Sequence, residues 1–598
     1  MSASNPVSSL NAVPSCTISL SGSELPASYE VFSVVVRQAV NRISRATVTI
    51  LGGDSYLHTF DESEDDIFKP GTEVTISLGY DQNNQSVFTG VVARLGIRVL
   101  PGYENAPHRN LLVVDCADKA LGLTLGKKSD IFEGKTDSDI ISSVLSDAGL
   151  TKAVDATTVT HPFMARYNST DWAFVLKRAR ANGLVVFNAD NKVTVTAPTP
   201  SGSAAAEVIY GDGALAFDAE VDASEQLKSV NGTSWDPFKE ADLSESGAEL
   251  SDMSDPGDLG GTTLAGVFAP DPLTIAYDAP VATAELKALA DAALVESRLL
   301  RVRGTALFRG MNAVKLGGVV TLSGFGSRFA GNVLVTSIEH QLEQGAYTTR
   351  IGFGLPRDFS ARLIQEENPA VPDIRGLYAG TVKKIDSDPD GDYRVQVMVP
   401  ALKNSGDGIW ARMAQLYATS SAGSFFYPEV GSEVIVGFMH GDPRFPVVLG
   451  GMYNSSNKPP ETPAAENPKK SIVSKEKLTL EFDDENKVLT LKTPGGNTIK
   501  MDDSSGITVE DSNGNSVKMA SSGVTIESGG SLTLKASQSV SIEGGTGVSL
   551  KASGGDVTMQ GLNVSAEAQI KFSGKGTAQA ELNGSGQVTV QGGIVMIN

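Results

Sequence analysis

Alternating apolar and polar residues dominate the first part of the chain. Between Thr17 and Cys116 the alternation marks segments such as Glu30 to Val36, Ala46 to Ile50 and Glu73 to Leu78, separated by Gly, Pro and Asp residues. A period of two is typical of strands that bury one face. We therefore expect a β-rich N-terminal region.

Helical spacing follows in three places. Residues 137 to 148 form the first predicted helix; Ser169 can cap the second, over 169 to 182, and Gly183 can end it. The third covers about 282 to 302. Strands are expected between and after them, at 184–187, 192–196, 317–322 and 333–338, and the acidic, Gly/Ser-rich stretch 240–261 is expected to be a long surface loop.

A new domain is predicted near Val371, after the polar stretch 365–369. It contains strands around 377–385 and 393–398 and ends at Tyr453, before a Pro-rich linker. The expected organisation is therefore a first region over 1–370, a small β domain over 371–455, a linker over 456–470 and a last region over 471–598.

The last region has a different pattern, in which apolar residues come in pairs two positions apart, with glycines between the pairs. The pattern predicts strand, turn, strand, turn. Its most regular part advances by eight residues from pair to pair: Val524/Ile526, Leu532/Leu534, Val540/Ile542 and Val548/Leu550. Less regular pairs lie on both sides: Leu489/Leu491, Ile499/Met501, Ile507/Val509, Val517/Met519, then Val557/Met559, Ile570/Phe572 and Val588/Val590.

Each such strand would bury only two side chains, which is too small a core for one chain and leaves an open sheet edge. Three chains wound together would close the edges and enclose the pairs. A single-chain parallel β-helix and a disordered Gly/Ser tail are the alternatives; the first usually needs longer coils, and the second would not keep an eight-residue period. About thirteen strands at ~4.8 Å each give a rod of roughly 60 Å, longer than a bilayer is thick.

Charge alternates directly after these pairs, at Glu527, Lys535, Glu543 and Lys551. If neighbouring strands come from different chains, each Glu can lie beside a Lys, a pairing worth about 0.2 to 1 kcal/mol.

Composition limits the function classes. The 598 residues carry a formal net charge of -21 with no basic patch, so we expect no nucleic-acid partner. Two cysteines give no disulfide framework. The N-terminus has no basic region followed by an apolar stretch, and no window approaches ~20 apolar residues, so we expect synthesis in the cytoplasm without a conventional export signal.

Candidate chemical motifs are weak. Asp386 to Gly391 matches half of a calcium loop, but Val397 stands where a bidentate Glu is needed. His440 to Arg444 could suggest acid-base work, although its Gly and Pro favour a structural turn. The glycines of 122–128 are too close for a phosphate loop, and the acidic run 61–66 is typical of a solvated loop. We expect no catalytic residue, no metal and no cofactor.

The segment from Gly423 to Asn454 resembles the signature of VgrG-type spike proteins of contractile injection systems. It reads GSFFYPEVGSEVIVGFMHGDPRFPVVLGGMYN, and its motif residues are Phe425, Pro428, Gly431, Val434, His440, Gly441, Asp442 and Pro443. The resemblance implies an OB-fold between a hub like that of phage baseplates and a β-helical needle. Val434, Val436, Val447 and Leu449 are the expected core positions. Further likeness to the hub lies at 41–43, 68–71, 87–92, 168–172 and Gly183.

The implied fold class is mainly β with a few helices: hub-like β-barrel domains, an OB-fold and an intertwined trimeric β-helix. The implied function is structural, without enzymatic activity: a homotrimer docks on the inner tube and baseplate proteins and punctures the target membrane when the sheath contracts. Effector cargo is a further implied partner. The particle resembles extracellular and phage-like systems more than typical type VI ones, and the spike would be found in it, outside the producing cell or delivered into a target cell.

At the end of the needle, apolar residues would receive a PAAR-like tip protein, through Val595, Ile597 and Asn598. No histidine follows His440, so a self-made metal tip is not expected. The linker leads from Tyr453 directly to Ser471 and the repeats continue to Asn598, so neither an inserted lysozyme domain nor a C-terminal effector domain is expected.

Two other functions remain open. A trimeric β-helical, tailspike-like enzyme would degrade polysaccharide with paired carboxylates and aromatic sugar platforms, but only Phe482 and Phe572 are aromatic in the last region. A receptor-binding fibre would need larger loops than these short turns.

Overall fold

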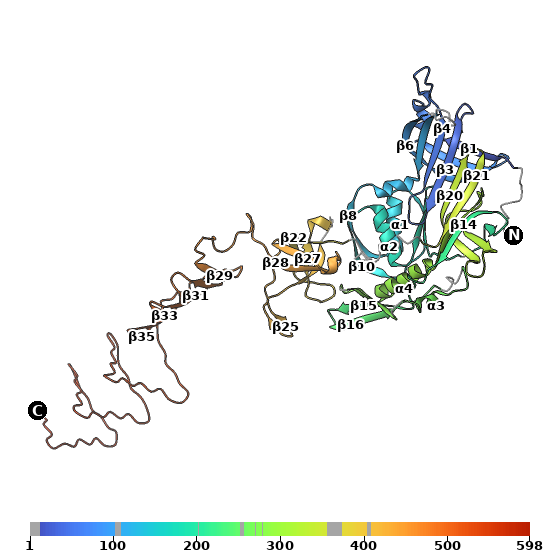
Figure 1. Ribbon diagram of the computed structural model, residues 1–598. Coiled ribbons are helices and arrows are strands. Elements are labelled where there is room, and N and C mark those ends of the chain that lie inside the picture. Colours follow the sequence, from blue (N-terminus) through green and yellow to red (C-terminus); the bar gives the residue numbers. More distant parts are fainter. Residues whose placement is uncertain are drawn as a thin grey trace. The chain divides into compact units, whose positions relative to one another are not determined.

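The computed structural model describes residues 12–101, 109–200, 202–250, 256–268, 271–277, 279–355, 373–402 and 408–597. The chain divides into two compact units, Met1–Lys458 and Pro459–Asn598, each described here by itself. Strands far outnumber helices, which confirms the mainly β fold class (Figure 1). In the described part of the chain, no helix has the length and apolar character needed to cross a membrane.

A 13-stranded sheet organises the N-terminal part of the first unit. Its path is β14-β18-β21-β20-β3-β4-β7-β6-β5-β1-β2; β19 also pairs with β20, and β13 with β19. The bounds are β1 Pro14–Leu20, β2 Ser23–Glu24, β3 Glu30–Ala39, β4 Arg45–Leu51, β5 Glu73–Tyr80, β6 Asn83–Leu100, β7 Arg109–Ala117, β13 Ala206–Ile209, β14 Ala214–Val221, β18 Val302–Arg309, β19 Val319–Ser323, β20 Gly331–Glu343 and β21 Ala346–Phe353.

Distant parts of the sequence meet in this sheet. β20 pairs antiparallel with β3, where His340 lies opposite Val36, and Figure 1 shows the early blue strands beside the later yellow ones. One core gathers around Ile76 and Leu112 and another around Phe308 and Ile351. The predicted period-two burial is confirmed, for example along β4.

Between β7 and β13 the chain leaves this sheet and forms two helices and five strands. Thr136 and Asp139 form a capping box at the start of α1. Thr170, and not the predicted Ser169, caps α2, because its hydroxyl accepts a hydrogen bond from the Ala173 N–H while the Ser169 hydroxyl donates to a carbonyl. The bounds are α1 Asp137–Asp147, α2 Asp171–Ala181, β8 Lys128–Thr136, β9 Thr151–Val154, β10 Thr160–Ser169, β11 Val185–Ala189 and β12 Lys192–Thr196.

The third predicted helix is α4, which packs on a three-stranded sheet in the order β16-β15-β17. The bounds are α3 Gly261–Ala265, α4 Thr283–Leu299, β15 Val230–Asp236, β16 Ala241–Ser246 and β17 Leu273–Tyr277. The prediction of a loop over 240–261 is wrong at both ends, since β16 pairs with the edge of β15 and α3 begins at Gly261; residues 251–255 lie outside the described part. Short 3-10 helices are η1 Asp61–Ser63, η2 Asp66–Phe68, η3 Lys119–Thr124, η4 Pro400–Leu402 and η5 Met439–Gly441.

A closed five-stranded barrel, β22-β23-β24-β28-β27, completes the first unit. Val434 and Val436 are fully buried in it. The prediction that Val447 and Leu449 join them is wrong: Val448 points inward instead. The pairing of β27 with β28 shifts between Ile435 and Val436, and a slip of one residue exchanges the two faces of a strand. The bounds are β22 Tyr378–Lys384, β23 Val395–Met398, β24 Ile409–Met413, β27 Glu433–Phe438, β28 Pro446–Gly451, and the hairpin β25 Ala418–Thr419 with β26 Ala422–Gly423.

The second unit begins as an antiparallel meander of seven five-residue strands. Each apolar pair predicted between Leu489 and Ile526 lies within one strand, so this part of the strand-and-turn prediction is confirmed. The bounds are β29 Lys469–Val473, β30 Thr479–Asp483, β31 Val488–Lys492, β32 Thr498–Asp502, β33 Gly506–Glu510, β34 Ser516–Ala520 and β35 Gly523–Glu527.

From Ser528 to Ile597 the described chain forms no strand pairing with itself, but it is regular. Bends recur at 529–530, 537–538, 545–546, 553–555, 561–562, 569–570, 577–578, 585–586 and 593–594. Their first residues are always eight apart. The eight-residue period of the sequence is therefore a geometric period of the backbone.

Candidate functional site

The apolar ladder is the most unusual surface of the second unit. We use this name for Val524, Ile526, Leu532, Leu534, Val540, Ile542, Val548 and Leu550. Each of these side chains is between 53% and 70% exposed in the single chain. All eight are thus more than half exposed, whereas the aliphatic core residues of the first unit are buried.

Such exposure is physically unfavourable for an isolated chain. Burying one Val, Leu or Ile side chain contributes about 1.5 to 3 kcal/mol, and large apolar side chains that are exposed together commonly mark interaction sites. The backbone is also unpaired, because the described residues after Glu527 form no strand-to-strand hydrogen bonds with their own chain. Unpaired strand edges readily pair with other chains.

Beyond the ladder, the positions of the bends show that one predicted apolar pair does not lie in a single extended segment. Ile570 was expected to lie in a strand with Phe572, but it falls in the bend 569–570 and is 99% exposed. Leu562 lies in the equivalent bend one period earlier, equally exposed. Phe572 stays between bends. The apolar pattern alone could not separate bend positions from strand positions here.

The alternating charges Glu527, Lys535, Glu543 and Lys551 are exposed, and no ion pair involving them is seen among the described residues of the chain. Pairing between chains therefore stays a prediction. Of the expected tip-docking residues, Val595 and Ile597 are exposed, and Asn598 lies outside the described residues.

The signature motif is divided between the surface and the core of the barrel. Phe425 is exposed, its ring centroid lies 4.7 Å from that of Tyr427 with the two planes tilted, and Pro428 is half-buried. Gly431 has a left-handed φ of 89° at the turn before β27. The residues expected to form a turn are brought together at η5, where His440 and Gly441 have φ values of 51° and 65°.

This left-handed turn turns the chain inward, so that Asp442 and Pro443 are buried. Asp442 accepts hydrogen bonds from the Arg444 guanidinium, at 3.0 Å from Nε and 2.7 Å from Nη2. The Arg444 Nη1 donates to Glu285 of α4 at 2.8 Å. Burial disfavours the charged guanidinium, but Asp442 and Glu285 together raise the pKa of Arg444 well above its usual range.

Glu285 extends this contact into a buried ionic cluster of Asp137, His161, Arg178, Glu285, Asp442 and Arg444. Arg178 donates to Asp137 at 2.6 Å and lies 3.9 Å from Glu285, and His161 lies 3.0 Å from Asp137. Although burial opposes ionisation, Arg178 and His161 lower the pKa of Asp137. The cluster joins α1, α2, β10, α4 and the barrel in one electrostatic contact.

Sequence reasoning missed every member of the cluster outside the motif. The available signal was an arginine among the apolar positions of 169–182, since an unpaired guanidinium is rarely buried. Within His440 to Arg444, the Arg444 guanidinium forms an ion pair with the Asp442 carboxylate. This pairing favours a structural turn over acid-base work.

The acidic turn at 386–391 is organised by Asp388. Its carboxylate accepts from the backbone N–H groups of Asp390, Asp392 and Arg394 and from the Arg394 guanidinium. Burial raises its pKa, but the Arg394 and backbone hydrogen bonds prevail and lower it to about 2. Within the described residues no cluster of His, Cys, Asp and Glu suited to a metal is present.

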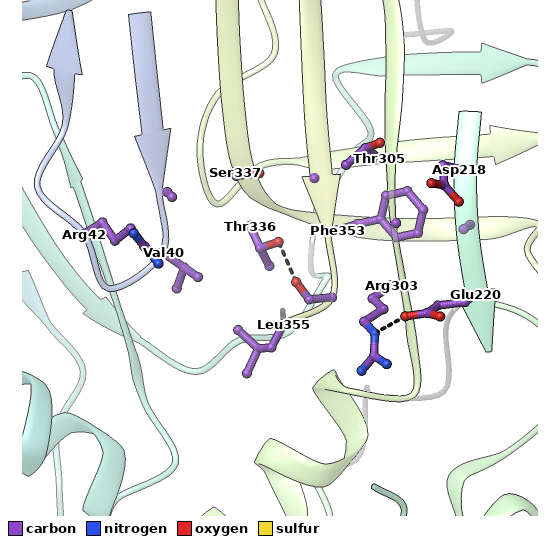
Figure 2. Close-up of a pocket in the computed structure, with 15 residues that line it drawn as sticks. Val40, Arg42, Asp218, Glu220, Arg303, Thr305, Thr336, Ser337, Phe353 and Leu355 are labelled. Atoms are coloured by element: carbon purple, nitrogen blue, oxygen red, sulfur yellow. Dashed lines mark hydrogen bonds and ion pairs between the residues drawn. The ribbon is translucent and has the colours of Figure 1, made fainter. Parts of the chain in front are cut away.

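A groove of about 500 Å³ lies where β3, β14, β18, β20 and β21 meet (Figure 2). Its Arg303 is engaged by Glu220 at 2.6 Å and by Asp222 at 2.5 Å, and the Thr336 hydroxyl donates to the Gly354 carbonyl. Phe353 is its one aromatic lining residue.

Comparison with known families assigns most of the chain. Residues 11–344, more than half of the chain, match the model of the Alg8 N-terminal domain. Residues 378–453 match the type VI secretion system/phage-baseplate injector OB domain, and 488–598 match the phage baseplate V C-terminal trimerisation domain. The chain belongs to the Alg8 N-terminal domain family and is a VgrG-type spike protein.

Individual relatives agree over shorter stretches. The type VI secretion system spike protein VgrG1a of Pseudomonas aeruginosa is 29% identical over 189 residues, 28% of this chain and 29% of the relative. The spike protein VgrG3 of Vibrio cholerae is 40% identical over 75 residues, 12% of this chain and 7% of the relative. The actin cross-linking toxin VgrG1 of the same species is 31% identical over 144 residues, 22% of this chain and 13% of the relative. The chain thus spans less than a third of each of these relatives.

A solved structure supports the fold of this VgrG-type chain. The lidded PdpA-VgrG complex of Francisella has a TM-score of 0.51 at 10% identity, covering 84% of this chain and 80% of that one.

Proposed function

We propose that three copies of this chain intertwine through the apolar ladder into a needle, and that the trimer is the central spike of a contractile injection particle. The exposed, eight-residue-periodic ladder carries the proposal. It has the exposed side chains, the regularity and the unpaired backbone that two further copies would cover, and the match to a trimerisation domain supports it.

The first unit would then serve as hub and collar. Its family membership and its fold support docking on an inner tube and on baseplate proteins, where it would take up the force of sheath contraction. The buried ionic cluster supports this role because it connects the barrel to α4 and α4 to α2. The chain would be assembled into the particle in the cytoplasm and carried with it to the target membrane.

A tip partner is part of the proposal. Val595 and Ile597 offer exposed apolar side chains for a PAAR-like protein. Effector cargo is a further proposed partner of the spike. The Francisella VgrG was solved together with PdpA, so a VgrG of similar fold holds a further protein. No chemistry is required of this chain in such a particle.

A pair of cysteine variants tests the intertwined needle. In a Cys16→Ser background, Leu532→Cys places a thiol on the proposed axis, where three copies converge, whereas Thr533→Cys is its outward-facing neighbour. Mild oxidation of the full chain should give covalent dimers on a denaturing gel for Leu532→Cys and few for Thr533→Cys. Equal yields from both positions, or none, would contradict the arrangement.

A further inference from the structure

The groove of Figure 2 crosses five neighbouring strands of the 13-stranded sheet, in the order β14, β18, β21, β20 and β3. One row of small residues runs through it from strand to strand. Each residue of the row lies directly opposite the next in the strand pairing: Asp218, Thr305, Gly352, Ser337 and Ala39. We call these five residues the groove floor.

Long side chains border the groove floor. Two residues further along the strands, the next row on the same face holds Leu307, Arg350, Glu339 and Arg37. Rows two residues apart are separated by about 7 Å. A Cβ atom at Gly352 would lie 2.3 Å from the Ser337 Oγ, so the floor keeps this depth only with glycine. The result is a channel that runs across the strands beside a ridge of large residues.

The dimensions of the groove fit a short extended peptide. Five strands at ~4.8 Å spacing give a floor about 19 Å long, and an extended chain of about six residues has the same length. The volume of about 500 Å³ is ordinary for a ligand site. A helix is about 10 to 12 Å across with its side chains, which is too wide for a channel between two rows of long residues.

Unpartnered polar groups line the groove. Arg303 is only 6% exposed, and its Nε and Nη2 donate to Glu220 and Asp222, but its Nη1 has no acceptor among the described residues. A buried donor without a partner is unfavourable. The hydroxyls of Thr305 and Ser337 likewise have no hydrogen-bond partner in the described part of the chain. Carbonyl and N–H groups of a peptide backbone are the partners that these groups lack.

Charge indicates what kind of peptide fits. At the β14 end, Asp218 is exposed and has no ion-pair partner within the part of the chain that the structure describes. Glu220 and Asp222 share the single guanidinium of Arg303 there. This end is therefore negative and favours a lysine or arginine. A second copy of this chain, at a net charge of -21, is a poor occupant for it.

We propose that this groove binds an extended segment of about six residues from a partner protein. The segment's carbonyls accept from Arg303 and from the floor hydroxyls, its small side chains lie on the groove floor, and a lysine or arginine lies beside Asp218. The proposal concerns the first unit alone and does not depend on the needle or on the trimer.

Fluorescence anisotropy with the full-length protein tests the proposal. The probe is a labelled hexapeptide with blocked ends, KAVSVA, which has one lysine and otherwise small residues. We expect binding with a dissociation constant below about 100 μM. Thr305→Tyr fills the floor and should weaken binding at least about tenfold, whereas Thr274→Tyr, at an exposed position of β17, should bind as the wild type does.

A charge exchange tests the orientation of the peptide without filling the groove. Asp218→Lys, at an exposed position of an edge strand, should weaken binding of KAVSVA at least about fivefold and should strengthen binding of EAVSVA. Asp147→Lys makes the same change in net charge at the exposed end of α1 and should alter neither. Absence of binding by the wild type, or equal binding by Thr305→Tyr, overturns the proposal. Should Thr305→Tyr fail to fold, equal effects of Asp218→Lys and Asp147→Lys overturn it instead.

Discussion

The barrel and the coils of the second unit use the same aliphatic residues with opposite results in a single chain. In the barrel, Val434 and Val436 are fully buried because five strands close on themselves and pair every edge. In the coils, Val540 and Ile542 are more than half exposed because successive eight-residue segments of one chain do not pair or pack on each other. The difference shows that a strand pattern specifies a face to bury, while topology decides whether one chain can bury it.

The largest effect should come from placing charge on the ladder. Val540→Asp/Ile542→Asp would put six carboxylates on the axis of a trimer, each with a desolvation penalty of several kcal/mol and like charges beside it. We expect complete loss of the trimer in light scattering. Ser541→Asp, the outward-facing neighbour, should leave the mass unchanged; a surviving Val540→Asp/Ile542→Asp trimer would argue against burial of this face.

In the first unit, the ionic cluster should be the most sensitive point. Arg444→Met leaves Asp442 and Glu285 buried without their partner, and breaking a buried pair in this way costs about 3 to 5 kcal/mol. Calorimetry should show a lower melting temperature for the first unit. Lys287→Met, which removes an exposed pair with Asp291 on the same helix, should cost less than about 0.5 kcal/mol.

A smaller, pH-dependent effect is expected at Asp388. Its folded pKa of about 2 is below the usual 3.8, so its ionised form stabilises the barrel above pH 3.8, and this stabilisation is lost as the pH falls through 2. Asp388→Asn should melt earlier than wild type at pH 5 to 7, and the gap should close towards pH 2. A gap that stays constant with pH would show that the ionised carboxylate is not responsible.

The smallest effect should come from the outer charges of the coils. Glu527→Lys/Glu543→Lys would turn expected pairs with Lys535 and Lys551 into repulsions of about 0.2 to 1 kcal/mol each. The trimer's melting temperature should fall at low salt and recover at 1 M salt, where screening is strong. Identical melting at both salt concentrations would remove the charge pairing from the account.

The sequence predicts local features well and distant contacts poorly. The eight-residue period and the helix at Asp137 follow from the spacing of apolar residues, which lie close together in the sequence. The inward face of β28 could not be predicted, because Phe445 to Leu449 is apolar in both phases and a register shift makes the choice. The partner of Arg444 lies 159 positions earlier, and no local pattern indicates it.

The native mass of the full-length protein tests the central claim most directly. The account predicts one species at three times the chain mass of 62.5 kDa, which persists on dilution because the ladder is buried between copies. A folded species at 62.5 kDa, with the second unit protected from protease, would contradict it, since a single chain would then cover its own ladder.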